Sequence, residues 1–242
     1  MNFPFNLAEN KDFDAVGFGT NAVDFLIVTP EYPAFNSKIE LVDYIQLAGG
    51  EIASTMAGLR RLGLKTAYAG RFGHDAAGDF GVQTLRDEGV NIEFAERVEG
   101  ARTQIAFIVI DARNGERTVM WDRDPKLSFS SNEAPVAAIS STKVLHLTPH
   151  DTAACVRMAQ AARENGVIVS TDIDRVFDGI HELLPYVDVL LASADFPAQL
   201  TGVSDHRESL SIIRERFDCP IVGITLGDHG SLLLAPEGFI DT

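Results

Sequence analysis

The sequence predicts an α/β fold with a mainly parallel central sheet, helices on both faces and a small additional β-layer in the N-terminal half. From residue 143 onward, short apolar runs alternate with helical patterns of about ten to fifteen residues, as βαβ units do. Runs such as VDVLLA and IVGITL are apolar throughout, which is typical of strands covered on both faces. The 242 residues suffice for one large domain with its own core.

In the N-terminal half, helical spacing is clearest after Gly49-Gly50. Ile52, Met56 and Leu59 recur at intervals of four and three residues, and Gly63 supplies a stop. This half is therefore predicted to contain strands at 14–20, 24–29, 39–47 and 66–69 and helices at 51–62 and 73–88.

Two further strands are predicted at 103–110 and 117–121, because the loop between them contains Asn114-Gly115, a strong hairpin signal. The strands at 24–29, 39–47, 103–110 and 117–121 are not all followed by helices, so we assign these four to the small β-layer. The C-terminal half is predicted to contain strands at 143–147, 167–171, 187–191, 221–225 and 231–234 and helices at 151–164, 177–184, 193–200 and 204–216.

The chain is strongly acidic, with a formal net charge of -15 at pH 7. Such a surface repels phosphate backbones and anionic lipids, so we expect no nucleic-acid or membrane partner. We find no basic segment followed by an apolar run at the N-terminus and no apolar stretch near the roughly 20 residues of a membrane span, so a cytoplasmic protein is expected. Cys155 and Cys219 fit no metal-binding pattern and are expected to be buried free thiols.

A glycine-rich turn follows the first predicted strand. The run GFGTNA at 17–22 mimics the start of a dinucleotide fingerprint, which needs a helix to follow at once. The next residues are β-branched and are broken by Pro30. A tight turn between strands is therefore favoured, and an NAD-binding turn is the alternative.

Two features near this turn have a functional and a plain interpretation. Asp24 lies among apolar residues, and it is either a solvated acid at a strand end or a carboxylate that accepts hydrogen bonds from a polyol. Gly49-Gly50 lies between a strand and a helix, where glycines allow close approach of the backbone to a ligand or simply form a loop.

Polar residues also follow two of the parallel strands. Thr225, Gly227 and Gly230 follow an apolar strand, where glycines let the backbone pass close to a nucleotide, although β-turns use the same residues. Asp172 and Asp174 end another strand, and a polar strand end is favoured over a metal site because no third ligand has suitable spacing. His146, within an apolar strand, is expected in the core or lining a pocket.

Residues 49–79 combine a Gly-Gly pair, a helix ending in RLG, a strand and the run G-x-x-G-x-D-x-x-G. This combination resembles the first signature of the ribokinase-like carbohydrate kinases, also called the phosphofructokinase-B family. GFGTNAVDF resembles the family's first strand with its sugar-binding Asp, RTVMWDRD its lid layer and ITLGDHGSLLL its nucleotide loop. The resemblance implies one ribokinase-like domain over 13–242, with lid strands within 24–48 and 103–122.

The resemblance also implies a function, the ATP-dependent phosphorylation of a sugar or nucleoside hydroxyl with Mg²⁺ as cofactor. Arg123 would meet a substrate phosphate or hydroxyl, with a solvated lid arginine as the alternative. The remaining implied contacts are Asp24, Gly49, Gly50 and Ser54 on the sugar and Ser193, Thr225, Gly227 and Gly230 on the nucleotide.

Three departures from the family pattern stand out. Ser54 replaces the usual Asn, and Ser193 and Phe196 replace the ends of N-x-x-E, so no metal ligand is assigned, although Asp195 is adjacent. The second signature, D-T-x-G-A-G-D, does not occur before Thr242. We therefore expect the catalytic base beyond Thr242 and little catalysis by these residues alone.

Two hypotheses remain open. The first is a sugar or nucleoside kinase whose partner is a small molecule. The second is a non-catalytic sugar- or nucleoside-binding module of the same fold. In either case the exposed lid sheet offers a face for a homodimer.

Overall fold

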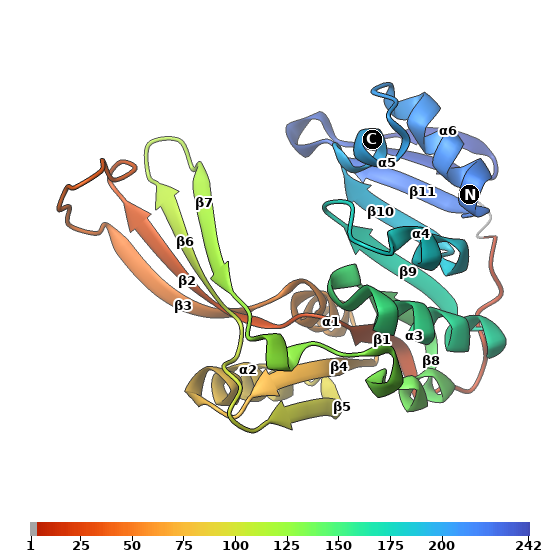
Figure 1. The fold of residues 1–242 in the computed structure, drawn as a ribbon, viewed down its shortest axis with the longest axis horizontal. Coiled ribbons are helices and arrows are strands. Elements are labelled where there is room, and N and C mark those ends of the chain that lie inside the picture. Colours follow the sequence, from red (N-terminus) through yellow and green to blue (C-terminus); the bar gives the residue numbers. More distant parts are fainter. Residues whose placement is uncertain (1–3) are drawn as a thin grey trace.

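The computed structural model describes residues 4–242, which form two sheets with helices packed on the larger one (Figure 1). In the larger sheet every neighbouring pair is parallel except β11–β12 and β12–β13. Its nine strands are, in spatial order, β13 (Gly238–Asp241), β12 (Ser231–Ala235), β11 (Ile221–Thr225), β10 (Val189–Ser193), β9 (Ile168–Ile173), β8 (Thr142–Leu147), β1 (Phe13–Phe18), β4 (Thr66–Gly73) and β5 (Asn91–Val98). The predicted parallel sheet is confirmed.

Helices cover both faces of this sheet, also as predicted. On one face Ile52 and Met56 of α1 occupy the space beside Gly17, where a Cβ would lie 2.5 Å and 2.7 Å from them. On the other face α3 to α6 pack over Val16, Leu145 and their neighbours. The helices are α1 (Glu51–Arg61), α2 (Ala76–Asp87), α3 (Thr152–Glu164), α4 (Ile180–Leu183), α5 (Phe196–Thr201) and α6 (His206–Phe217). We call this sheet with its helices the body.

The second sheet, which we call the small sheet, projects from one side of the body (Figure 1). Its order is β3 (Asp43–Gly49), β2 (Ala22–Thr29), β6 (Ile105–Asp111) and β7 (Arg117–Asp122), with β2 and β6 parallel and the outer pairs antiparallel. The row Leu47, Asp24, Ala106 and Trp121 runs across all four strands, so these side chains share one face.

The structure differs from the prediction mainly at element ends and at two strands. The predicted helix at 73–88 begins only at Ala76, because β4 continues to Gly73 and the Asp75 carboxylate accepts the N–H of Gly78 as an N-cap. The predicted helix at 177–184 is reduced to one α-helical turn and a 3₁₀ turn. Strands β5 and β13 were not predicted, since both lie at sheet edges and NIEFAERV is too polar to signal a buried strand.

Three simpler expectations have clear outcomes. Strand β2 begins at Ala22, the last residue of GFGTNA, so a tight turn between strands is confirmed and the dinucleotide alternative, which needs a helix there, is wrong. Cys155 and Cys219 are buried and free, as expected. Within residues 4–242, no helix combines the length and apolar character that crossing a bilayer requires.

Candidate functional site

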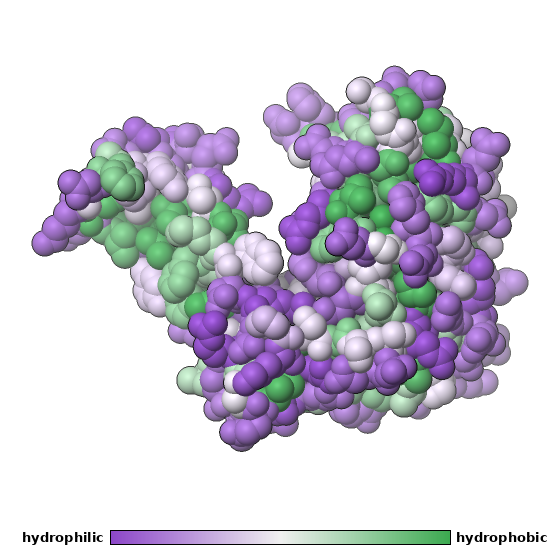
Figure 2. Space-filling model, viewed as in Figure 1, coloured by the Kyte–Doolittle hydropathy of each residue, from purple (hydrophilic) through white to green (hydrophobic). Residues whose placement is uncertain are grey.

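A cleft of about 380 Å³ lies where the small sheet meets the body, and the hollow between them is visible in Figure 2. The small sheet and its approach contribute the side of the cleft formed by Asp24, Gln104, Ala106, Ile108, Val119 and Trp121. Ala22 begins β2, and the body and its connections contribute Thr20, Gly50, Glu51, His150, Asp174 and Arg175. The cleft lies at the carboxyl ends of parallel strands, where open α/β sheets bind ligands.

The Asp24 carboxylate faces this cleft from β2. Burial raises its pKa above the ordinary value for an aspartate. Ala106 separates it from Trp121 in the same row of the sheet. The small alanine therefore leaves space over the sheet between an acidic group and an indole ring, which is a combination that suits a polyol with an apolar ring face.

The two glycines at the end of β3 are required by close packing within the chain. A side chain at Gly49 would collide with the Asp24 carboxylate. Gly50 has a φ of 93°, and a Cβ there would lie 2.7 Å from the backbone nitrogen of Ala22. Gly50 also lines the cleft. The pair thus allows β3 and α1 to press against the start of β2, directly beside Asp24.

Glu51, the first residue of α1, forms polar contacts on the body side of the cleft. Its Oε2 accepts hydrogen bonds from Nε2 of His150 at 3.1 Å and from Oγ1 of Thr20 at 3.5 Å. Burial alone would raise the Glu51 pKa, but the hydrogen bond and charge of His150, together with a hydrogen bond from Thr148 and the charge of Arg175, outweigh burial, so the pKa is lowered. Glu51 is therefore ionised at neutral pH.

Asp172 near the end of β9 and Asp174 directly after it add to the negative charge at this edge. Burial raises the pKa of Asp172, and the nearby charges of Glu51 and Asp174 raise it further. Arg175 supplies an opposite charge, and its guanidinium lies 4.7 Å from the centre of the Phe177 ring. In the part of the chain that the structure describes, no cluster of three potential metal ligands is present.

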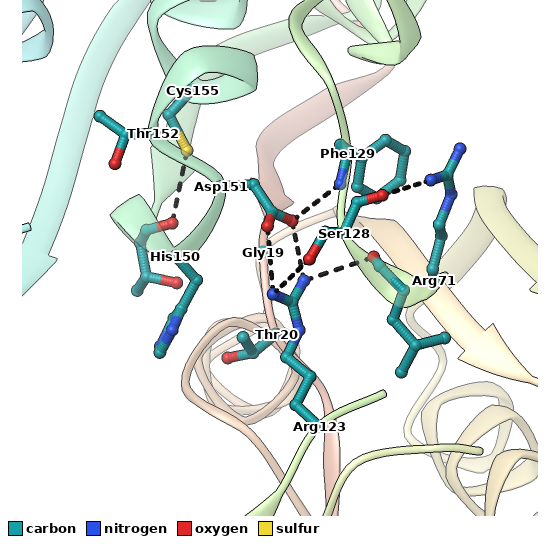
Figure 3. Close-up of polar contacts among 12 residues, drawn as sticks. Gly19, Thr20, Arg71, Arg123, Ser128, Phe129, His150, Asp151, Thr152 and Cys155 are labelled. Atoms are coloured by element: carbon teal, nitrogen blue, oxygen red, sulfur yellow. Dashed lines mark hydrogen bonds and ion pairs between the residues drawn. The ribbon is translucent and has the colours of Figure 1, made fainter. Parts of the chain in front are cut away.

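Ser54 and Arg123 do not line the cleft with Asp24. Ser54 lies with Gly49 in a separate hollow between α1 and α2. The Arg123 guanidinium forms a two-pronged ion pair with Asp151, with only 15% of its side chain exposed (Figure 3). Its two Nη groups also contact Leu127 and Ser128. The expectation that Arg123 meets a substrate phosphate or hydroxyl stays a prediction.

The residues expected at a nucleotide lie together at the ends of β10 and β11. Ser193 and Thr225 are paired neighbours in the sheet. The Ser193 hydroxyl donates to the backbone carbonyl of Asp174 at 2.7 Å, so this edge adjoins the cleft. Phe196, at the last position of the family's N-x-x-E, is fully buried in the core.

The two glycines after β11 have different structural roles. Gly227 has a φ of 61° and faces open space, so it provides the left-handed turn that begins the loop. Gly230 has a φ of 88°, and a side chain there would collide with the backbone carbonyl of Thr242. The loop is therefore open toward solvent at Gly227 and packed at Gly230 against Thr242, the residue after β13.

Sequence patterns missed several cleft residues, namely Glu51, Gln104, Trp121, His150 and Arg175. Two signals could have found some of them. His150 and Arg175 both follow parallel strands, at the edge where ligands bind. Trp121 is the single tryptophan of the chain and lies on a predicted strand in register with Asp24. The Gln104 Oε1 is a buried acceptor for which residues 4–242 offer no hydrogen-bond partner.

Solved structures with this architecture are ribokinase-like. A putative ribokinase from Agrobacterium tumefaciens superposes with a TM-score of 0.87 at 20% identity, covering 95% of this chain and 76% of that chain. The Arabidopsis thaliana ribokinase complexed with ribose and ATP superposes with a TM-score of 0.76 at 22% identity, covering 95% and 77%. The fold is therefore that of the ribokinase-like proteins, with a mostly parallel sheet, flanking helices and a small second sheet.

The family follows from the sequence comparison. The model of the pfkB family carbohydrate kinases matches residues 14–240, so the chain belongs to this family. Fructokinase-2 of Oryza sativa subsp. japonica is 29% identical over 234 residues, which cover 89% of this chain and 68% of that protein. The nucleoside kinase of Methanothermobacter thermautotrophicus is 28% identical over 163 residues, which cover 67% of this chain and 52% of that protein.

Proposed function

We propose that this protein transfers the terminal phosphate of ATP to a hydroxyl group of a free sugar or nucleoside bound in the cleft. The observation that carries the proposal is the Asp24 carboxylate facing a cleft beside Trp121 in a chain of the pfkB family. An ionised carboxylate accepts hydrogen bonds from two hydroxyls of a polyol, and the indole covers the apolar face of a ring.

Further cleft groups support a polyhydroxylated ligand. The unpaired Gln104 Oε1 offers a second acceptor for a hydroxyl. Glu51 contributes a carboxylate, and its contact with His150 fixes its orientation. Because a small apolar surface and a few fixed polar groups are typical of small-molecule sites, this set suits one sugar-sized ligand.

We propose that ATP lies beside the cleft, along Ser193, Thr225 and the loop that begins at Gly227. The support is the contact between Ser193 and Asp174, which joins this edge of the sheet to the cleft. Mg²⁺ fits this edge because burial, together with the charges of Glu51 and Asp174, raises the pKa of Asp172, and a cation would relieve the repulsion among these carboxylates. Mg²⁺ supplies charge neutralisation of the phosphates when it is bound, and one or two carboxylates commonly suffice to hold it.

We further propose that the general base is supplied from beyond Thr242. The relatives support this proposal, since residues of this chain cover 68% of the rice fructokinase. An uncovered part of the sheet also supports it. Leu191 and Leu233 flank Gly223 on the face opposite α3 to α6, and Leu191 is 37% exposed. An additional helical layer on this face would bury these side chains.

The small sheet is proposed to act as a lid and as the face of a homodimer. On the face turned away from Asp24, Phe25 stacks between Tyr44 and Phe107, with ring centroids 6.3 Å and 5.2 Å away. Tyr44 is 52% exposed and Phe107 is 41% exposed. A second copy would cover this apolar strip, so Phe107→Glu should convert a dimer to a monomer in sedimentation.

The buried thiols of Cys155 and Cys219 support a reducing compartment such as the cytoplasm.

Thermal unfolding of this chain against free fructose, ribose and adenosine tests the proposed function. A ligand at 100 times its Kd adds about 2.7 kcal/mol to the stability, which gives a readable rise in Tm. The proposal expects a rise with one of these compounds and none with glycerol at the same concentration. If a cooperatively melting chain shows no rise with any of them, the cleft is not a sugar site.

A further inference from the structure

The connection that leaves the small sheet is held by a buried ion pair. Directly after β7, Nη2 of Arg123 lies 2.7 Å from Oδ2 of Asp151 and Nη1 lies 3.1 Å from Oδ1 (Figure 3). The two side chains are only 15% and 9% exposed. A two-pronged contact of this kind fixes the orientation of the guanidinium as well as its position.

Further contacts fasten the residues that follow Arg123. Arg123 also donates to the Leu127 carbonyl and the Ser128 hydroxyl, at 3.3 Å and 3.2 Å. The Phe129 N–H donates to Oδ2 of Asp151 at 3.2 Å. Asp151 therefore receives three donors from the segment that connects the small sheet to the body.

The other side of this segment is held by Arg71 of β4. Its Nη1 donates to the Ser128 carbonyl at 2.6 Å, and its guanidinium lies 4.0 Å from the centre of the Phe129 ring. Phe129 in turn packs edge-on against Phe18 of β1. The segment that directly follows β7 is thus held between the central strands and the start of α3.

Asp151 is also adjacent to the cleft. It lies in one 3₁₀ turn (Pro149–Asp151) with His150, whose ring contacts Glu51 inside the cleft. The same short turn therefore carries the anchor of the small sheet and one wall of the cleft. A group in this position can set how the sheet face with Trp121 lies over the body.

We propose that Arg123 and Asp151 form a positioning pair that holds the small sheet in a fixed orientation over the cleft, without contacting the ligand. The inference rests on the proposed function only in taking the cleft as the sugar site. Removing one partner would leave a buried charge without its counterion, so the connection would rearrange to reach water. The sheet would then sample orientations in which Trp121 no longer faces the body.

The orientation of the sheet can be measured without any ligand. Spin labels would be attached in a chain that carries Arg117→Cys in β7 and Glu164→Cys in α3, because both positions are exposed. Cys155 and Cys219 are buried and should remain unlabelled. Double electron–electron resonance then gives the distribution of distances between the two labels, and hence of orientations of the small sheet relative to the body. We expect a narrow distribution in the parent chain and a broader one with Asp151→Asn.

A matched control exists one residue from Arg123. Asp122 pairs with Arg102 at 2.8 Å, but these side chains are 55% and 72% exposed. Asp122→Asn should leave the distribution unchanged, because an exposed pair contributes little. An Asp151→Asn distribution as narrow as that of the parent, in a chain that melts cooperatively, would overturn the proposal.

A milder variant covers the case in which Asp151→Asn does not fold. Arg123→Lys keeps the charge but lacks the planar guanidinium, so we expect a spin-label distance distribution of intermediate width. A distribution as narrow as that of the parent chain would overturn the proposal. If the competent orientation falls to about one tenth of the population, sugar affinity falls about tenfold. An absence of sugar binding in the parent chain would contradict the proposed function alone, since the distance distributions would still decide this inference.

Discussion

Replacing Asp24 by Asn should separate ligand binding from stability, because the two effects have opposite signs. The variant keeps the size of the side chain and removes its charge. Hydrogen bonds to a charged acceptor are worth about 1.5–3 kcal/mol, and bonds to a neutral one about 1 kcal/mol. For two sugar hydroxyls the loss is about 2 kcal/mol, or roughly a thirtyfold rise in Kd.

The stability effect follows from the raised pKa of Asp24, which burial causes. A carboxyl whose pKa is higher in the folded state than in the unfolded state binds protons more readily when folded. Its ionisation therefore destabilises the fold above the raised pKa, and this penalty disappears as the pH falls below the unfolded value. At neutral pH Asp24→Asn should thus unfold at equal or higher urea concentration, and the difference should shrink on acidification.

The single tryptophan provides the assay. Trp121 lies in the same row as Asp24, so a bound sugar should change its emission, and titration gives Kd directly. Asp122→Asn, on the same sheet but exposed, serves as the control and should change neither Kd nor stability. Parent-like affinity in Asp24→Asn would refute the assignment, and a parallel loss of affinity and stability would indicate a packing role instead.

Three further predictions concern the glycines, the buried histidine and the charge of the cleft. Gly50→Ala should destabilise the chain by about 2 kcal/mol or more, since φ is 93° and the neighbouring backbone is close, whereas Gly58→Ala, with open space inside α1, should stabilise it by about 1 kcal/mol in urea unfolding. Burial lowers the pKa of His146 to about 4, so the unfolded chain takes up its proton first and stability should fall as pH drops from 6.5 to about 4. In His146→Gln this dependence of stability on pH between 6.5 and about 4 should be absent. Sugar phosphates should bind more weakly than free sugars because three carboxylates line the cleft. In titrations followed by Trp121 emission, Glu51→Lys should reduce the difference in Kd between the two kinds of ligand.

Most of the fold could be predicted because its buried strands can be recognised from a few consecutive residues. Runs such as IVGIT are buried on both faces and read as continuous apolar segments. Edge strands do not have this property, so β5 and β13 were missed. Element ends were also misplaced where a side chain elsewhere decides the boundary, as Asp75 does for α2.

The site was predictable only where a functional role leaves a local pattern. Asp24 stands out as a charge in an apolar strand, and the structure does place it in the cleft. Arg123 also stands at the end of a predicted strand, but its partner Asp151 is 28 residues away. Only the packing of the start of α3 against the residues after β7 brings the two together. Glu51 and His150 are 99 residues apart, so no spacing rule could have joined them.

The glycine motifs show the limit most clearly, because they signal close approach without naming what approaches. In the signature that resembles the kinase family, a Cβ at Gly73 would lie 2.6 Å from the backbone nitrogen of Thr103, and Oδ2 of Asp75 accepts the same N–H at 2.9 Å. Thr103 is where the chain enters the small sheet before β6. Gly50 does the same for the passage from β3 to α1. These residues therefore fasten the points at which the small sheet joins the body.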